Sequence, residues 1–297
     1  MEWTRSDLKT KAKDFLRTRY WYAFLVTWIA GMLGGAGSGG GSGGFTSTFG
    51  DQDFSGIPPA LWIIIGVLAV LGAAFGIAFT LFVGGPVTIG MDRWFSRTRE
   101  GEEASRIGLL FSLFRRGSYL KSVGAYAWMT LWGFVWSLPS VAAFSAAGVL
   151  LAATRIETGS FDLVPMGIAS VLLAVGFALL IPAIMRSYAY RLTPWILADN
   201  PGIGHRRALR LSIAMSDGHK AGMFVLDLSF IGWYLLGFLA CCVGVLFVTP
   251  YVVASWAELY ATLKGSAVAQ GLCTAEELGY AKAEASAATL PQEGSPA

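Results

Sequence analysis

The stretch SYAYRLTPWILADNPGIGHRRALRLSIAMSDGHKAGMFVLDLSFIGW, residues 187–233, decides how this chain folds. It joins two apolar runs through a basic, turn-rich connector, which holds both histidines of the chain. An aspartate, Asp227, interrupts the second apolar run. Basic residues at the ends of long apolar runs are typical of a membrane surface. The stretch therefore predicts a surface connector between two membrane-spanning helices.

The composition of the whole chain agrees with a membrane protein. Of the 297 residues, 55% are hydrophobic and 14% are charged, whereas a soluble domain carries about 25% charged residues. The formal net charge is only +3, and no basic stripe is interleaved with aromatic residues, so nucleic-acid binding is not expected. The three cysteines have no metal or redox spacing, and neither a metal nor another cofactor is expected.

The apolar runs predict an all-α, polytopic transmembrane bundle of about six spans. The first four cover about 20–35, 60–87, 123–152 and 166–190, with kinks expected at Pro86, Pro139 and Pro182. The run from Ala221 to Leu263 is too long for one crossing and predicts two, with a turn near Cys241–Gly244. A flexible external loop of glycine and serine follows the first span over 34–44.

Two glycines in the second span favour close helix packing. Gly72 and Gly76 form a Gly-x-x-x-Gly pair, which lets another helix approach the backbone. Packing against a helix of the same chain is the preferred interpretation, and dimerisation is the alternative.

The basic residues orient the spans and divide the chain. All but one of the 22 Lys and Arg residues fall in segments that this arrangement places on one side of the membrane. Only Arg155 lies on the other side, so both termini are expected in the cytoplasm. The predicted units are an amphipathic helix over 1–19, a six-span membrane domain over 20–264 and a flexible cytoplasmic tail over 265–297.

Amphipathic segments are expected on the cytoplasmic membrane surface. The first, capped by Thr4 or Ser6, places four apolar residues on one face: Leu8, Ala12, Phe15 and Leu16. A second interfacial helix is predicted from apolar residues at helical spacing: Ile107, Leu110, Phe111 and Phe114. In the tail, Thr274-x-x-Glu277 matches a capping box.

A third surface helix is expected in the central connector. Asp199 or Asn200 is expected to cap it, with Pro201 in its first turn and Asp217-Gly218 at its end. The basic residues of this region are candidates for anionic lipid headgroups, and they serve equally well as determinants of topology: Arg206, Arg207, Arg210 and Lys220.

Asp227 is the sharpest candidate for a functional residue, because a carboxylate inside a membrane span is costly and has to find a partner. An ion pair with Lys220, Arg186 or Arg191 is preferred over a proton or ion relay, since only one such acid is evident. His205 and His219 lack a ligand set or a nucleophile beside them, so no catalytic residue and no metal site is expected.

Several blocks of residues carry a family resemblance. The most specific are Ala198-Asp199-Asn200-Pro201 and Ser229-Phe230-Ile231-Gly232-Trp233, with further matches at Arg5-x-x-Leu8-Lys9 and Gly218-His219-Lys220. By these residues the chain resembles the bacterial integral membrane proteins of domain-of-unknown-function family 975. The resemblance implies a bacterial plasma-membrane location and no particular biochemical activity.

These observations favour a non-enzymatic scaffold or envelope-associated protein whose partners are membrane lipids, with protein partners and a homo-oligomer left open. The alternative is a transporter or permease component that uses Asp227 in a bundle of helices broken at Pro139, Pro182 and Pro250. An intramembrane enzyme would need a second acid, histidine or serine that faces Asp227.

Overall fold

The computed structural model describes residues 3–34, 58–101, 103, 106–115, 117–158, 163–239 and 243–279. All regular elements in these ranges are helical, which confirms the predicted all-α class. The expected glycine and serine loop lies outside the described residues, except for Gly34.

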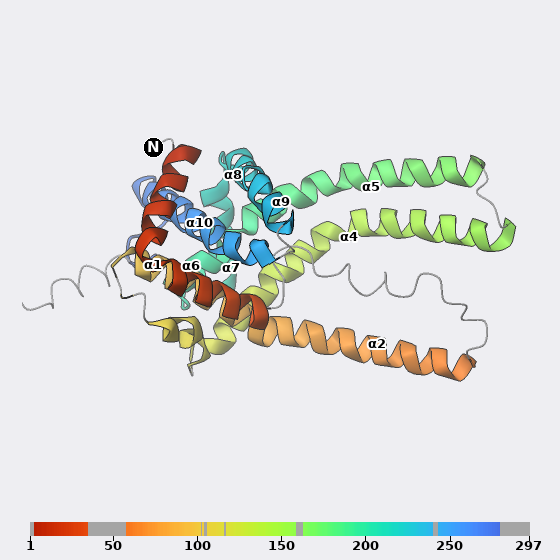
Figure 1. Ribbon diagram of the computed structural model, residues 1–297, viewed down its shortest axis with the longest axis horizontal. Helices are drawn as coiled ribbons and strands as arrows, with labels where there is room; N and C mark the ends of the chain where they lie inside the picture. Colours follow the sequence, from red (N-terminus) through yellow and green to blue (C-terminus); the bar gives the residue numbers. More distant parts are fainter. Residues whose placement is uncertain are drawn as a thin grey trace, which may run out of the picture.

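Several helices project to one side of a body that the other helices form (Figure 1). They are α2 (Pro59–Phe79), α4 (Tyr119–Thr158) and α5 (Leu163–Tyr190), and α4 and α5 pack side by side. The body contains α1 (Arg5–Gly34), α3 (Gly85–Arg99), η3 (Ile107–Phe114), α6 (Thr193–Asp199), α7 (His205–Ser216), α8 (Lys220–Leu228), α9 (Ile231–Leu239) and α10 (Val243–Ala269).

The buried core lies in the body, and the apolar surface lies mostly on the projecting helices. Leu8 of α1, Trp94 of α3 and Tyr260 of α10 are at most 2% exposed and belong to one cluster. On the projecting helices, by contrast, Phe75 is 72% exposed and Phe177 is 64% exposed. Such large apolar side chains are stable in contact with lipid rather than water.

Five helical segments are long and apolar enough to cross a membrane: Ile63–Arg99, Tyr119–Thr154, Leu163–Asp199, Lys220–Leu239 and Gly244–Ala269. They suggest a membrane-embedded protein. The sequence predicts one span more, over 20–35, and the structure places these residues mainly in α1, which is not among the five.

The N-terminal amphipathic segment and the expected first span form one helix, α1, which runs unbroken for 30 residues. Leu8, Ala12 and Leu16 are buried in the core of the body. The apolar face of this segment is therefore covered by protein rather than left for the membrane. The expected cap is present, because Thr4 Oγ1 accepts a hydrogen bond of 3.4 Å from the Asp7 N–H.

The kink expected at Pro86 has a clear physical cause. Proline has no N–H to donate to the carbonyl four residues earlier, which here is that of Phe82. A π-helical turn, η2 (Thr80–Gly84), comes directly before α3, and the Phe82 carbonyl instead accepts a hydrogen bond of 2.9 Å from the Tyr119 hydroxyl. The side chain of a neighbouring helix thus satisfies the group that the proline leaves free.

The segment predicted as an interfacial α-helix, residues 107–114, has a different helical period. Residues 107–114 form a 3-10 helix, so side chains repeat every three residues rather than every 3.6. Leu110 and Leu113 face the core at 0% exposure, whereas Phe111 and Phe114 are 43% and 38% exposed. The four residues expected on one face are therefore divided between the core and the surface.

The expected cap at Asp199 or Asn200 is wrong. Asp199 ends α6, and Asn200 closes a turn in which its Oδ1 accepts a hydrogen bond of 2.9 Å from the Gly202 N–H. The next helix, α7, begins only at His205, after Gly204 with a φ of 81°. The end expected at Asp217-Gly218 agrees with the structure, where α7 stops at Ser216 and Gly218 has a φ of 75°.

The expected packing of Gly72 and Gly76 within the chain does not occur among the described residues. A Cβ at either position would have no atom within 4 Å. Close packing occurs instead between α9 and α10, where a Cβ on Gly237 would lie 2.8 Å from the Gly244 carbonyl carbon. The turn between these helices falls where it is expected, since α9 ends at Leu239 and α10 begins at Val243.

The first residues of the expected tail, 265–279, belong to the described part of the chain. α10 continues to Ala269, and Cys273 and Leu278 beyond it are buried. The Glu277 N–H donates to Thr274 Oγ1 over 3.1 Å, as a capping box requires, but the segment forms a turn rather than a helix. Residues 280–297 lie outside the described part of the chain.

Candidate functional site

Asp227 lies in the last turn of α8, and its carboxylate contacts three side chains. The Tyr188 hydroxyl donates to Oδ2 and the Trp256 indole N–H donates to Oδ1, each over 2.9 Å. Arg191 Nη2 lies 3.8 Å from Oδ2, and its guanidinium carbon lies 4.5 Å from the centre of the Trp256 ring. α5, the turn after it and α10 thus converge on one acid.

The structure selects one of the three cations expected beside Asp227. Arg191 is the partner, whereas Lys220 bonds to Asp217 over 3.1 Å. The guanidinium carbon of Arg186 lies 4.6 Å from the centre of the Trp136 ring instead. Sequence reasoning did not anticipate the hydrogen bonds from Tyr188 and Trp256.

A second acid, Asp199, is more deeply buried. Its Oδ2 accepts a hydrogen bond of 2.8 Å from the Tyr260 hydroxyl and lies 2.7 Å from Lys264 Nζ. The side chains of Asp199 and Lys264 are 3% and 6% exposed. Glu100 Oε1 lies 3.6 Å from the same ammonium. Two buried charges of opposite sign therefore hold the end of α6 against α10.

Both acids are met by one face of α10, which sequence reasoning missed. Trp256, Tyr260 and Lys264 follow one another at four-residue spacing, which places them on one side of a helix. Glu258, also buried, faces Arg99 with 2.8 Å between Oε1 and Nε. The signal was available in the sequence, since Glu258 and Lys264 are charged residues in or beside a long apolar run.

Two of the blocks that carry the family resemblance meet at the break between α8 and α9. Lys9 Nζ donates to the Ser229 carbonyl over 3.3 Å and lies 4.6 Å from the centre of the buried Phe230 ring. Partial burial lowers the pKa of Lys9. A cation at this position is favourable because the carbonyl end of a helix carries partial negative charge. Gly232 and Trp233 follow on an exposed part of α9.

The basic residues expected at lipid headgroups do not form one free patch. Arg207 makes two hydrogen bonds to the Glu277 carboxylate, of 2.7 and 3.0 Å, and these bonds lower the pKa of Glu277. Lys220 is paired with Asp217, as described above. Arg206 lies 5.6 Å from the Trp128 ring centre and Arg210 bonds to the Arg206 carbonyl, and both side chains stay exposed. Asn200 Nδ2 donates to the Glu277 carbonyl over 3.2 Å, in the turn that Pro201 continues.

The two histidines lie beside tryptophans, His205 at the start of α7 and His219 directly before α8. His205 is 5.4 Å from Trp128 and His219 is 6.2 Å from Trp3, measured between ring centres. In the described ranges no three His, Cys, Asp or Glu side chains come together as a metal site would require.

The fold and these contacts define a helical protein with an ion-paired body and projecting apolar helices, and its five long apolar segments suggest that it is membrane-embedded. The chain belongs to the family described as Protein of unknown function (DUF975), whose model matches residues 1–267. This confirms the resemblance noted from the sequence. A search of curated proteins and a search of solved structures each found no match.

Proposed function

We propose that this protein is a non-enzymatic membrane scaffold whose ion-paired body fixes the positions of its membrane helices and contacts anionic lipids. The observation that carries the proposal is the environment of Asp227, whose carboxylate is held by Tyr188, Trp256 and Arg191. An acid that joins three segments in this way stabilises their arrangement.

The chemistry of two of these three partners supports a structural role over a proton relay. An indole N–H only donates, and an arginine stays protonated, so neither Trp256 nor Arg191 passes a proton onward. Removing one member of the Asp227 set leaves a charge that water still reaches in part, because the side chains of Arg191 and Asp227 are 39% and 25% exposed. The side chains of Asp199 and Lys264 are almost fully buried, and breaking that pair leaves a poorly solvated charge, which is strongly destabilising.

The proposed topology has six spans in a bacterial plasma membrane, with both termini in the cytoplasm. The span added to the five candidates comes first along the chain and is the second half of α1. There Trp21 is 72% exposed and Met32 is 64% exposed, as lipid-facing residues are. The excess of Lys and Arg on one side supports this orientation. Lipid contact is supported by the exposed side chains of Arg206 and Arg210 on α7 and of Phe111 and Phe114 on η3.

A flux assay separates this proposal from the transporter alternative. The full chain and its Asp227→Asn variant are placed in vesicles that contain a trapped pH-sensitive dye. We expect the wild type to leak protons no faster than empty vesicles, with and without a sodium or potassium gradient. We expect Asp227→Asn to unfold at a lower temperature, because Asn carries no charge to pair with Arg191. Flux through the wild type that Asp227→Asn abolishes would establish the transporter instead.

A further inference from the structure

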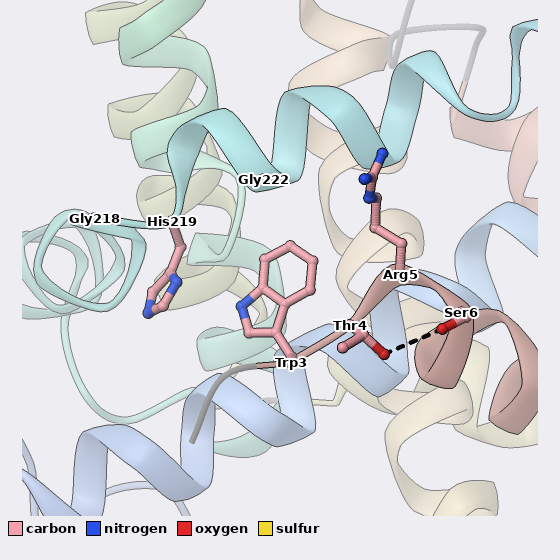
Figure 2. Close-up of a pocket in the computed structure, with 7 residues that line it drawn as sticks. All are labelled: Trp3, Thr4, Arg5, Ser6, Gly218, His219 and Gly222. Atoms are coloured by element: carbon pink, nitrogen blue, oxygen red, sulfur yellow. Dashed lines mark hydrogen bonds between the residues drawn. The ribbon is translucent and has the colours of Figure 1, made fainter.

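A cavity of 620 Å³ lies between the N-terminal end of α1 and the start of α8 (Figure 2). Its walls are residues 3–6 on one side and Gly218, His219 and Gly222 on the other. This volume is within the range of about 300–1,000 Å³ that is common for sites of small molecules and headgroups. None of the features described above uses this cavity.

The lining of the cavity suits an anion. Among the described residues it includes the side chains of Arg5 and His219 and no carboxylate. A guanidinium binds phosphate oxygens through directed hydrogen bonds. Both α1 and α8 begin at the cavity, so their first-turn N–H groups, which lack partners within the helix, add positive potential. Asp7, in the first turn of α1, is held by Thr4 and does not line the cavity.

Trp3 gives the cavity an aromatic wall. Figure 2 shows its indole between His219 and Arg5, with the Arg5 side chain extending toward α8. A Cβ on residue 222 would lie 2.8 Å from Trp3 Cη2. The indole therefore approaches α8 this closely because residue 222 is glycine.

The position of the cavity along the chain indicates the source of the anion. The candidate span Lys220–Leu239 begins at its wall. Phe224 and Leu228, on the next turns of α8, are 47% and 50% exposed. The end of a span lies at the depth of lipid headgroups, where tryptophan is also enriched.

We propose that this cavity binds the phosphate group of an anionic phospholipid, with Arg5 as its ligand and with Trp3 and His219 as the aromatic wall beside it. The inference deepens the lipid contact of the proposed function and rests on it for the location of this face at the membrane. The two can fail separately. Ion flux through the wild type would overturn the proposed function, whereas a His219 NMR signal that does not respond to lipid would overturn only the lipid site.

The chain has only two histidines, which makes a selective test possible. The full chain, labelled at histidine and held in maltoside micelles, is titrated with dihexanoyl phosphatidylglycerol while the imidazole NMR signals are followed. His205, packed on Trp128, serves as the internal control for folding. Inorganic phosphate and dihexanoyl phosphatidylcholine are titrated in parallel. Arg5→Gln is compared with Lys11→Gln, which removes an exposed cation from the same helix away from the cavity.

We expect phosphatidylglycerol to shift the His219 signal saturably and to leave His205 unchanged. Arg5→Gln should weaken binding roughly tenfold, as the loss of a charged hydrogen bond does, and Lys11→Gln should change it about twofold or less. A shift that only inorganic phosphate produces, with the same dependence on Arg5, would replace the lipid with free phosphate as the ligand. No saturable shift, or equal weakening by both variants, would overturn the site.

Discussion

Lys264 Nζ lies 2.7 Å from Asp199 Oδ2, and the two side chains are only 6% and 3% exposed. Lys264→Met keeps the length of the side chain and removes the charge, so Asp199 is left buried without its cation. We expect a loss of about 3–5 kcal/mol of unfolding free energy, as for other broken buried pairs. Chemical unfolding of the purified protein, in micelles of one constant composition, measures this loss.

The control for this variant is Lys220→Met, because Lys220 pairs with Asp217, whose side chain is 80% exposed. Stability should change very little there, since water replaces the lost partner. The double variant Asp199→Asn with Lys264→Met should recover part of the loss. Equal effects of the two lysine substitutions would contradict the assignment of Lys264 to a buried pair.

Gly237 allows α9 and α10 to pack through their backbones. A Cβ there would lie 2.8 Å from two backbone atoms, Gly244 C and Val245 N, which cannot rotate away as a side chain can. Gly237→Ala should therefore force the helices apart and destabilise the protein by about 1–3 kcal/mol. Gly72→Ala is the matched control, because the space around Gly72 is open. Alanine also has a higher helix propensity than glycine, so this variant should not lose stability. Melting temperatures in the same detergent test this: Gly237→Ala should melt below the wild type, and Gly72→Ala should not.

The contact between Arg207 and Glu277 should make the end of the chain sensitive to acid. The hydrogen bonds from Arg207 lower the pKa of Glu277 in the folded state. The contact therefore stabilises the fold fully above the unfolded pKa of Glu, about 4.3, and this contribution disappears as the pH falls through the lower folded pKa. Hydrogen exchange of residues 270–279, corrected for the intrinsic effect of pH, should rise over that window. Glu277→Gln should remove the pH dependence, and a wild type without any such rise would refute the prediction.

Tyr119 satisfies the carbonyl that Pro86 leaves free. Tyr119→Phe removes the hydrogen bond of 2.9 Å to the Phe82 carbonyl and keeps the ring that stacks on Phe114. We expect a loss of about 0.5–1.5 kcal/mol. Pro86→Ala restores an N–H donor, and in that background the effect of Tyr119→Phe should shrink. A double-mutant cycle on unfolding free energy measures the coupling, which should be zero if the Tyr119 hydroxyl serves no purpose at this carbonyl.

The prediction from sequence was strongest where one local property decides the structure. Long apolar runs give long helices, so α4 and α5 cover the spans expected at 123–152 and 166–190, although α4 continues to Thr158, and the turn between α9 and α10 agrees with expectation. The error at Asn200 arose because a residue type that caps helices also closes turns, and the choice depends on the contact with Glu277. The error over 107–114 arose because α and 3-10 periods share the same spacing of three residues for part of the segment.

The sequence by itself determined the helical class, the apolar helices, the family and the presence of an acid, Asp227, within an apolar run. These follow from composition and local order, which do not depend on the position of any other segment. Only the tertiary structure decided that Arg191, rather than Lys220 or Arg186, meets Asp227, and that Asp199 meets Lys264 on α10. The energy of an ion pair depends on the distance in space between the two charges, and not on how many residues separate them along the chain. The folded arrangement of α5, α6, α8 and α10 therefore had to be known before any partner could be assigned.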